Sequence, residues 1–278
     1  MATSTWRIHK ILRLTILISL FSCVLSKGCD ETITAIIKLM VEHMLAAQDV
    51  MACSSTARPF ITASFTQSLD GKIAAFERDG TGTTTSNYPL SGKESLLLTH
   101  AIRSVHDGIV VGGRTLLIDN PKLTNRLWVE SEGKQPRPIV LDTHLRYIRE
   151  LGDSKRVENI IACCSEEAAA SFESIPSSVQ ILSCKCSSDG RLDLDDVLSK
   201  LYTRFGIKSV MVEGGAAVLN SFLNQGLVDH ICITVAPKLL GAGIALSCSH
   251  QLAPSRFFLL GSDCVLISPW PSNSKHTS

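Results

Sequence analysis

The chain has 278 residues, the length of one large domain or two small ones, and 45% of them are apolar against 19% charged, which excludes a disordered chain. Lys and Arg number 27 against 26 Asp and Glu, a formal net charge of +1, so no overall field draws the chain to nucleic acid and we expect no nucleic-acid partner. The ten cysteines include no CxxC pair, which argues against zinc-ribbon and thioredoxin chemistry, and no metal centre is expected.

The first 58 residues are expected to form an extension before the main domain. Residues 14–26 are an uncharged apolar run after a basic start, a pattern typical of a secretory signal but short for a membrane span. The alternative is an extension that is not translocated. Contact with a membrane is therefore expected only if this run acts as a signal or an anchor.

Residues 31–48 place apolar side chains, among them Ile33, Ile36 and Met40, at helical intervals and predict a helix. A polar joint follows this helix, so the main domain is expected to cover residues 59–270. Residues 271–278 are expected to be a loose tail.

From residue 59 onward, short β-branched or apolar runs alternate with longer amphipathic stretches. The expected strands cover residues 59–65, 107–112, 138–142, 158–164, 178–184, 208–215 and 230–241, with a closing hairpin at 256–267. Helices are expected at 91–106 with Ser91 as N-cap, at 192–206 and at 216–226, and residues 113–126 are expected to be turn-rich. The alternation predicts an α/β fold with three layers, α/β/α, in which a mostly parallel central sheet ends in a C-terminal hairpin.

Familiar nucleotide and hydrolase signatures are missing from the sequence. It contains no GxGxxG, P-loop, HExxH, GxSxG or PCxxC motif, which argues against a Rossmann dinucleotide site, a zincin, an α/β-hydrolase and a cytidine-type deaminase.

Two strand ends carry glycine pairs instead. Gly112-Gly113 ends one strand just before Thr115, and the cations Arg114, Lys122 and Arg126 follow. The second strand ends in Glu213-Gly214-Gly215 before a helix. Amides at such turns hold phosphate where no side chain blocks its approach, and open α/β sheets bind ligands at these ends. Ordinary β-to-α turns with solvated charges are the alternative.

Two further features concern polar groups. In the SLDGK stretch, Ser68 and Asp70 either contact a ligand or cap a turn. Arg103 lies among the leucines of the expected 91–106 helix. A buried guanidinium there needs an anionic partner, either an internal carboxylate or a ligand phosphate.

Taken together, six motifs resemble the reductase family of riboflavin biosynthesis, which has the dihydrofolate-reductase-like fold. The motifs occur in the family's order over roughly residues 59–240, and they lie at 68–71, 102–103, 107–112, 115–123, 136–142 and 212–215. The resemblance implies NADPH as cofactor and hydride transfer to the ribosylamino group of a pyrimidine 5′-phosphate, which opens the ribose into a ribityl chain.

The resemblance also implies roles for individual residues. Glu213 is expected to be catalytic, with Asp119 as the alternative group that passes a proton to the nitrogen. Cofactor contacts are expected from the Thr66 backbone, Thr115, Asp119, Gly214, Gly215, Ala216, Ala217 and Val218. Substrate contacts are expected from Asn87, Arg103, Leu123, Arg126 and Glu213. Ser165 is a candidate for the 2′-phosphate of NADPH.

The chain departs from the bacterial type of this family. It has Pro89 near a position where those members often carry Trp, no Lys between Arg58 and Lys72, and no deaminase half. It therefore resembles the stand-alone fungal and archaeal branch, which reduces the 2,5-diamino pyrimidinone.

Three alternatives stay open: a deaminated pyrimidine substrate, a dihydrofolate-reductase-like enzyme acting on a pterin or another small molecule, and a member that binds the nucleotide without turnover. The resemblance also implies a homodimer. Because NADPH and the pathway intermediates are soluble cell contents, we expect a cytoplasmic protein, with secretory or organellar targeting through residues 1–29 as the alternative.

Overall fold

The structure is a computed structural model that describes residues 29–52, 57–76, 88–128, 135–151, 158–171 and 177–270. The apolar run at 14–26, the tail at 271–278 and Asn87 lie outside the described residues, so the predictions made for them stay predictions. Within these ranges, no helix combines the length and the apolar character that a membrane crossing needs.

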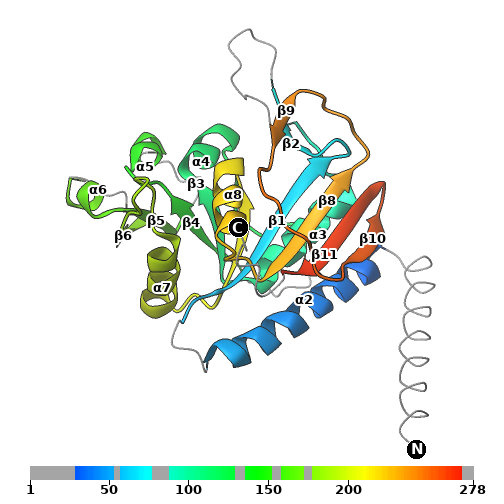
Figure 1. Ribbon diagram of the computed structural model, residues 1–278, viewed down its shortest axis with the longest axis horizontal. Coiled ribbons are helices and arrows are strands. Elements are labelled where there is room, and N and C mark those ends of the chain that lie inside the picture. Colours follow the sequence, from blue (N-terminus) through cyan, green and yellow to red (C-terminus); the bar gives the residue numbers. More distant parts are fainter. Residues whose placement is uncertain are drawn as a thin grey trace, which may run out of the picture.

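A nine-stranded sheet forms the centre of the molecule (Figure 1). Its strands lie in the order β10-β11-β8-β1-β7-β3-β4-β5-β6, and every neighbouring pair from β8 to β6 is parallel. The strands are β1 (Phe60–Ser68), β3 (Gly108–Gly112), β4 (Arg137–Leu141), β5 (Ile160–Ser165), β6 (Val179–Cys184), β7 (Ser209–Gly214), β8 (His230–Ala236), β10 (Arg256–Leu260) and β11 (Asp263–Pro269). The antiparallel β10–β11 pair confirms the expected C-terminal hairpin.

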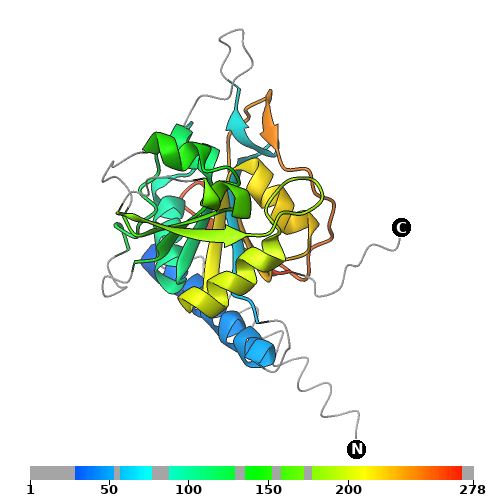
Figure 2. The same ribbon diagram turned by 90° about the vertical axis from the view of Figure 1, so that its left-hand side faces the viewer.

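Helices cover both faces of this sheet, which confirms the three-layer α/β/α prediction (Figure 2). One face packs against α7 (Leu194–Phe205) and α8 (Ala216–Asn224). The other face packs against α2 (Cys29–Ala52), α3 (Lys93–Val105), α4 (Gly113–Asp119), α5 (Arg146–Leu151) and α6 (Glu166–Ala170). The alternation along β3 shows the division, because Val110 faces the first layer while Ile109 and Val111 face the second.

Helix α2 confirms the helix expected at 31–48 and joins a core cluster with α3 and the C-terminal hairpin. Ile33 and Ile36 are fully buried, and Met40 is nearly so. All three belong to the cluster that contains Leu98 of α3 and Val265 of β11. The helix therefore covers part of the sheet, while the domain boundary at residue 59 stays a prediction.

Two local predictions are corrected by the structure. Gly92, not Ser91, is the N-cap of α3. The carboxylate of Asp263 accepts hydrogen bonds there from the Gly92 N–H (2.7 Å) and the Ser95 hydroxyl, whereas the Ser91 hydroxyl shares a hydrogen bond with that of Thr66. A carboxylate brought by a distant strand thus replaces the local cap, which sequence spacing does not reveal.

The second correction concerns residues 113–126, which were expected to be turn-rich. Their first half is the helix α4, and only the part after Asp119 is irregular.

A small antiparallel sheet was not predicted from the sequence. It pairs β2 (Lys72–Ala75) with β9 (Gly243–Ala245). Asp70 joins the turn after β1 to the segment before β9, because its carboxylate accepts hydrogen bonds from the Leu240 and Gly241 N–H groups and from the Ser68 hydroxyl.

Candidate active site

The neighbouring strands β3 and β7 send their chains to opposite faces of the sheet. β3 continues into α4 on one face, and β7 continues into α8 on the other. Such a divergence leaves room beyond the carboxyl ends of the strands, and open α/β sheets bind ligands at this point. Both glycine pairs singled out in the sequence lie there.

The loops after β3 and β7 touch. The N–H of Gly215 donates to the hydroxyl of Thr115 at 2.8 Å. A methyl group on Gly215 would come within 2.9 Å of that same oxygen, and one on Gly112 would come within 3.1 Å of Val218. The glycines are therefore needed for the two loops to approach, and this convergence agrees with the expectation that both loops contact one cofactor.

Among the described residues, no side chain caps the first amide groups of helix α8, those of Ala216, Ala217 and Val218. Its N-cap is Gly215, which has no side chain to accept from them, and the bond from Gly215 N–H to Thr115 leaves these following amides unused. The first N–H groups of a helix have no acceptor inside the helix and carry a partial positive charge. The amides of Ala216, Ala217 and Val218 therefore fit a phosphate or pyrophosphate group, as expected for these residues.

The backbone of Thr66 lies at the edge of β1 that faces β7. Phe60 N–H donates to Lys208 O on that side, and because backbone groups alternate along a strand, Thr66 points the same way. The β1–β7 register ends at Ala63 and Val212, whereas β1 stays paired with β8 as far as Ser68. The Thr66 N–H and C=O groups thus lie beyond the described β1–β7 ladder, next to the loop that follows β7.

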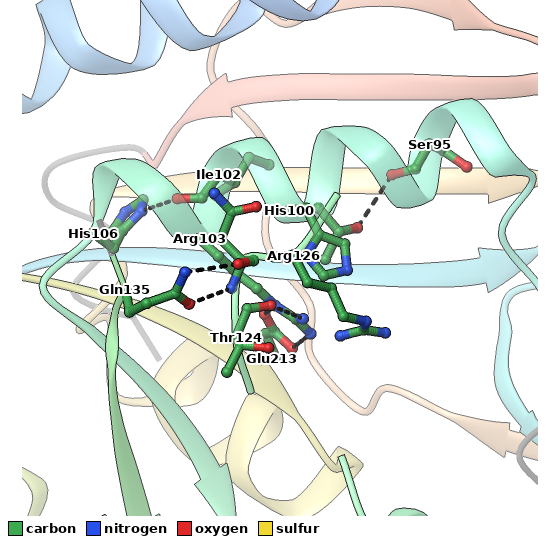
Figure 3. Close-up of polar contacts among 11 residues, drawn as sticks. Ser95, His100, Ile102, Arg103, His106, Thr124, Arg126, Gln135 and Glu213 are labelled. Atoms are coloured by element: carbon green, nitrogen blue, oxygen red, sulfur yellow. Dashed lines mark hydrogen bonds and ion pairs between the residues drawn. The ribbon is translucent and has the colours of Figure 1, made fainter. Parts of the chain in front are cut away.

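Arg103 and Glu213 form a two-point ion pair at the end of β7 (Figure 3). Nε and Nη2 of the guanidinium donate to the two carboxylate oxygens at 2.6 and 2.7 Å, and the two side chains are only 10% and 14% exposed. Burial alone lowers the pKa of Arg103, but the carboxylate outweighs this effect and the pKa is raised. Of the two partners that the sequence left open for Arg103, the structure shows an internal carboxylate.

The segment after α4 is held by side chains from elsewhere. Nη1 of Arg103 donates to Thr124 O at 3.0 Å. The amide of Gln135 accepts from the Asn125 N–H (2.9 Å) and donates to its carbonyl (2.7 Å). Asn125 in turn exchanges two hydrogen bonds with the backbone of Trp128. This irregular segment therefore has a defined backbone that presents Arg126 to solvent.

Leu123 and Ser165 lie differently from what their expected roles suggest. The Leu123 side chain is completely buried in the core with Ile109 and Val111, so a ligand contact there requires the backbone. The Ser165 hydroxyl accepts from the Ala168 N–H and caps α6, which occupies it locally. Asp119 is half-buried at the end of α4, and burial raises its pKa.

Sequence reasoning missed two residues of this site, His100 and Gln135. His100 lies one turn before Arg103 on α3, fully buried, and its Nδ1 accepts from the Arg126 N–H at 3.1 Å. The three-residue spacing to Arg103 was a usable signal, because such residues share a helix face. Gln135 carried no signal, since its partner is a backbone ten residues away.

A family model described as the RibD C-terminal domain matches residues 59–262. The chain belongs to the RibD C-terminal domain family. Helix α2 precedes the matched part of the chain. Among relatives of known name, the 2,5-diamino-6-ribosylamino-4(3H)-pyrimidinone 5′-phosphate reductase of Kluyveromyces marxianus is 33% identical over 202 residues, 68% of this chain and 78% of that protein. The protein of the same name from Debaryomyces hansenii is 35% identical over 207 residues, with the same shares covered.

Solved structures of RibD-type reductases have the same architecture. The riboflavin biosynthesis reductase Rib7 of Saccharomyces cerevisiae superposes with a TM-score of 0.60 at 26% identity, over 78% of this chain and 92% of that one. The deaminase/reductase of Thermotoga maritima gives 0.57 at 25% identity, over 76% and 57%. The expected dihydrofolate-reductase-like fold is thereby confirmed.

Proposed function

We propose that this member of the RibD C-terminal domain family is an NADPH-dependent reductase of 2,5-diamino-6-ribosylamino-4(3H)-pyrimidinone 5′-phosphate, which converts the ribosyl group into a ribityl group. The fungal relatives that carry this name support the substrate. The observation that carries the proposal is the contact between Thr115 and Gly215, because it brings both glycine loops to one ligand-binding edge of the sheet.

The residues at this edge fit a dinucleotide. The uncapped amides of Ala216, Ala217 and Val218 would hold its pyrophosphate, and the edge groups of Thr66 would hydrogen-bond the nicotinamide carboxamide. Thr115 and Asp119 would contact it from α4. When bound, NADPH would supply the hydride, and the protein would align the sugar with it and exclude water.

The substrate would lie beside the Arg103–Glu213 pair. Arg103 is engaged by Glu213 and Thr124, so its charge is largely committed within the protein. Arg126 is exposed, and its guanidinium contacts no carboxylate among the described residues, so we assign the substrate phosphate to Arg126. Asn87 is proposed as a further contact on the resemblance alone.

Two carboxyl groups are candidates for passing a proton to the nitrogen. Both oxygens of Glu213 accept from Arg103, so this side chain is engaged in holding and orienting its neighbours. Burial raises the pKa of Asp119, which makes it easier to protonate than an ordinary aspartate. Comparing the pH profiles of kcat in Glu213→Gln and Asp119→Asn variants separates the two roles.

The deciding experiment mixes the purified protein with NADPH and the diaminopyrimidine phosphate. Loss of absorbance from reduced nicotinamide, with formation of the ribityl product, supports the proposal. Binding of both ligands without oxidation identifies a binder and overturns it. Parallel assays with 5-amino-6-(5-phosphoribosylamino)uracil, with a dihydropterin and with NADH in place of NADPH distinguish the alternative substrates and the cofactor.

We also propose a homodimer and a cytoplasmic location. The edge strand β10 exposes Phe257 (57%) and Leu259 (63%), apolar surface that a second copy would cover. Sedimentation equilibrium tests the dimer, with a Phe257→Ser and Leu259→Ser variant expected to be monomeric. Imaging of a fusion that keeps residues 1–29 tests the location.

A further inference from the structure

His100 lies in the described core with no contact to solvent, between two arginines of the site. It is on α3, three residues before Arg103, and its exposed fraction is zero. Its Nδ1 accepts a hydrogen bond from the backbone N–H of Arg126 at 3.1 Å. Figure 3 shows the imidazole between α3 and the segment that carries Arg126.

This contact fixes the protonation state of the ring. An imidazole nitrogen that accepts from an amide carries no proton, so the proton of the neutral ring is on Nε2. Burial, followed by the charges of Arg103 and Arg126, lowers the pKa of His100 to about 4, although the Thr124 carbonyl acts in the opposite direction. A protonated ring would lose the acceptor and would add a third cation beside two arginines.

The backbone of three consecutive residues, 124–126, is hydrogen-bonded by three side chains from outside the segment that follows α4. Arg103 binds the carbonyl of Thr124, Gln135 binds both backbone groups of Asn125, and His100 binds the N–H of Arg126. Of these contacts, only that of His100 is made to the residue whose guanidinium is directed to solvent. The carbonyl of Asn125 and the N–H of Arg126 belong to one planar peptide unit, so Gln135 and His100 together set where the Arg126 side chain begins, and His100 supplies the contact to Arg126 itself.

We propose that His100 is a positioning residue, which holds Arg126 so that its guanidinium receives the phosphate group of a sugar-phosphate substrate. This inference rests on the proposed function for the identity of the substrate, but the observation behind it is the hydrogen bond that the neutral imidazole of His100 accepts from the Arg126 N–H. No proton is transferred and His100 itself does not touch the substrate.

The test compares two replacements of His100. Asn places an amide oxygen close to the position of Nδ1 and keeps the acceptor, whereas Leu fills similar space without one. For His100→Leu we expect KM for the diaminopyrimidine phosphate to rise about 10-fold, with kcat and KM for NADPH within about 3-fold of the wild type. His100→Asn should recover most of the loss. Thr99→Val, which removes a hydroxyl bond within α3, serves as the matched control.

A double-variant cycle shows whether His100 acts through Arg126. If it does, His100→Leu adds no further increase in KM to an Arg126→Ala protein. An equal additional loss in that background, or equal losses in kcat and in both KM values, would mean that His100 only supports the fold and would overturn the proposal.

Binding of ribose 5-phosphate, measured by calorimetry, keeps the test independent of turnover. If the wild type binds this probe and His100→Leu and Arg126→Ala weaken it alike, the positioning role stands even where no NADPH is oxidised and the reductase proposal fails. If the wild type reduces its substrate but His100→Leu leaves both KM and probe affinity unchanged, the positioning role fails and the reductase proposal stands. If the wild type neither binds ribose 5-phosphate nor reduces the diaminopyrimidine phosphate, the positioning role and the reductase proposal both fail.

Discussion

The hydroxyl of Thr115 accepts a hydrogen bond from the N–H of Gly215 at 2.8 Å and so joins two loops that are 100 residues apart in the chain. Thr115→Val keeps the shape of the side chain and removes the acceptor, which leaves this N–H unpaired beside the first amides of α8. We expect KM for NADPH to rise about 10-fold and kcat to change by less than about 3-fold, measured by steady-state kinetics.

A control for that variant is available on the same helix. Ser221 donates its hydroxyl to Ala217 O within α8, and Ser221→Ala should leave both parameters unchanged. An unaltered KM for NADPH in Thr115→Val would show that the contact between the loops does not shape the cofactor site.

Variants of the Arg103–Glu213 pair are expected to regain stability without regaining activity. Removing one partner of a buried pair leaves an uncompensated charge, so Glu213→Leu should lower the free energy of unfolding by about 3 kcal/mol in a urea titration. Combining it with Arg103→Met replaces the pair by apolar groups and should recover most of that loss. Turnover should be lost in both proteins. A double variant no more stable than the single one would contradict this account.

His230 predicts a dependence of stability on pH. It is 1% exposed, neither ring nitrogen bonds a described residue, and burial, followed by the charges of His43 and His106, lowers its pKa from 6.5 to about 3. The folded protein disfavours the charged ring, so this contribution is complete above the unfolded pKa and is lost as the pH falls below about 6.5. From this ring alone we expect the free energy of unfolding to fall by about 2 kcal/mol between about pH 7 and pH 5.

Denaturant titrations at several pH values test this expectation. In His230→Leu the free energy of unfolding should fall less steeply as the pH is lowered. Some dependence on pH should remain in this variant, because the pKa of the buried His100 is also lowered. The same slope in both proteins would assign the pH dependence to other groups.

Helix α2 predicts that residues before the matched family region contribute to folding. Ile36 is fully buried in the cluster that α2 forms with α3 and the hairpin, so Ile36→Ala should cost about 3 kcal/mol. Lys38→Ala, at an exposed position of the same helix, should change stability by less than about 0.5 kcal/mol. A small effect of Ile36→Ala in the urea titration would mean that α2 packs loosely.

Periodic and contiguous features were predictable from the sequence. The strands from β3 to β8, the long helices and the hairpin were all expected, because alternation and helical spacing are properties of adjacent residues. The convergence of the loops at Gly113 and Gly215 was also expected, since parallel strands present their carboxyl ends on one edge. Short elements such as α4 and β9 were missed because a few residues carry too little pattern.

The sequence by itself determined the α/β class, the glycine turns and the family of this protein, since these depend on residue order and on local backbone freedom. Only the tertiary structure decided that the partner of Arg103 is Glu213, that Asp263 caps α3, that Leu123 is buried and that His100 holds Arg126. Each of these contacts joins elements that are far apart in the chain, and the packing of the sheet and its helices sets the distances between them.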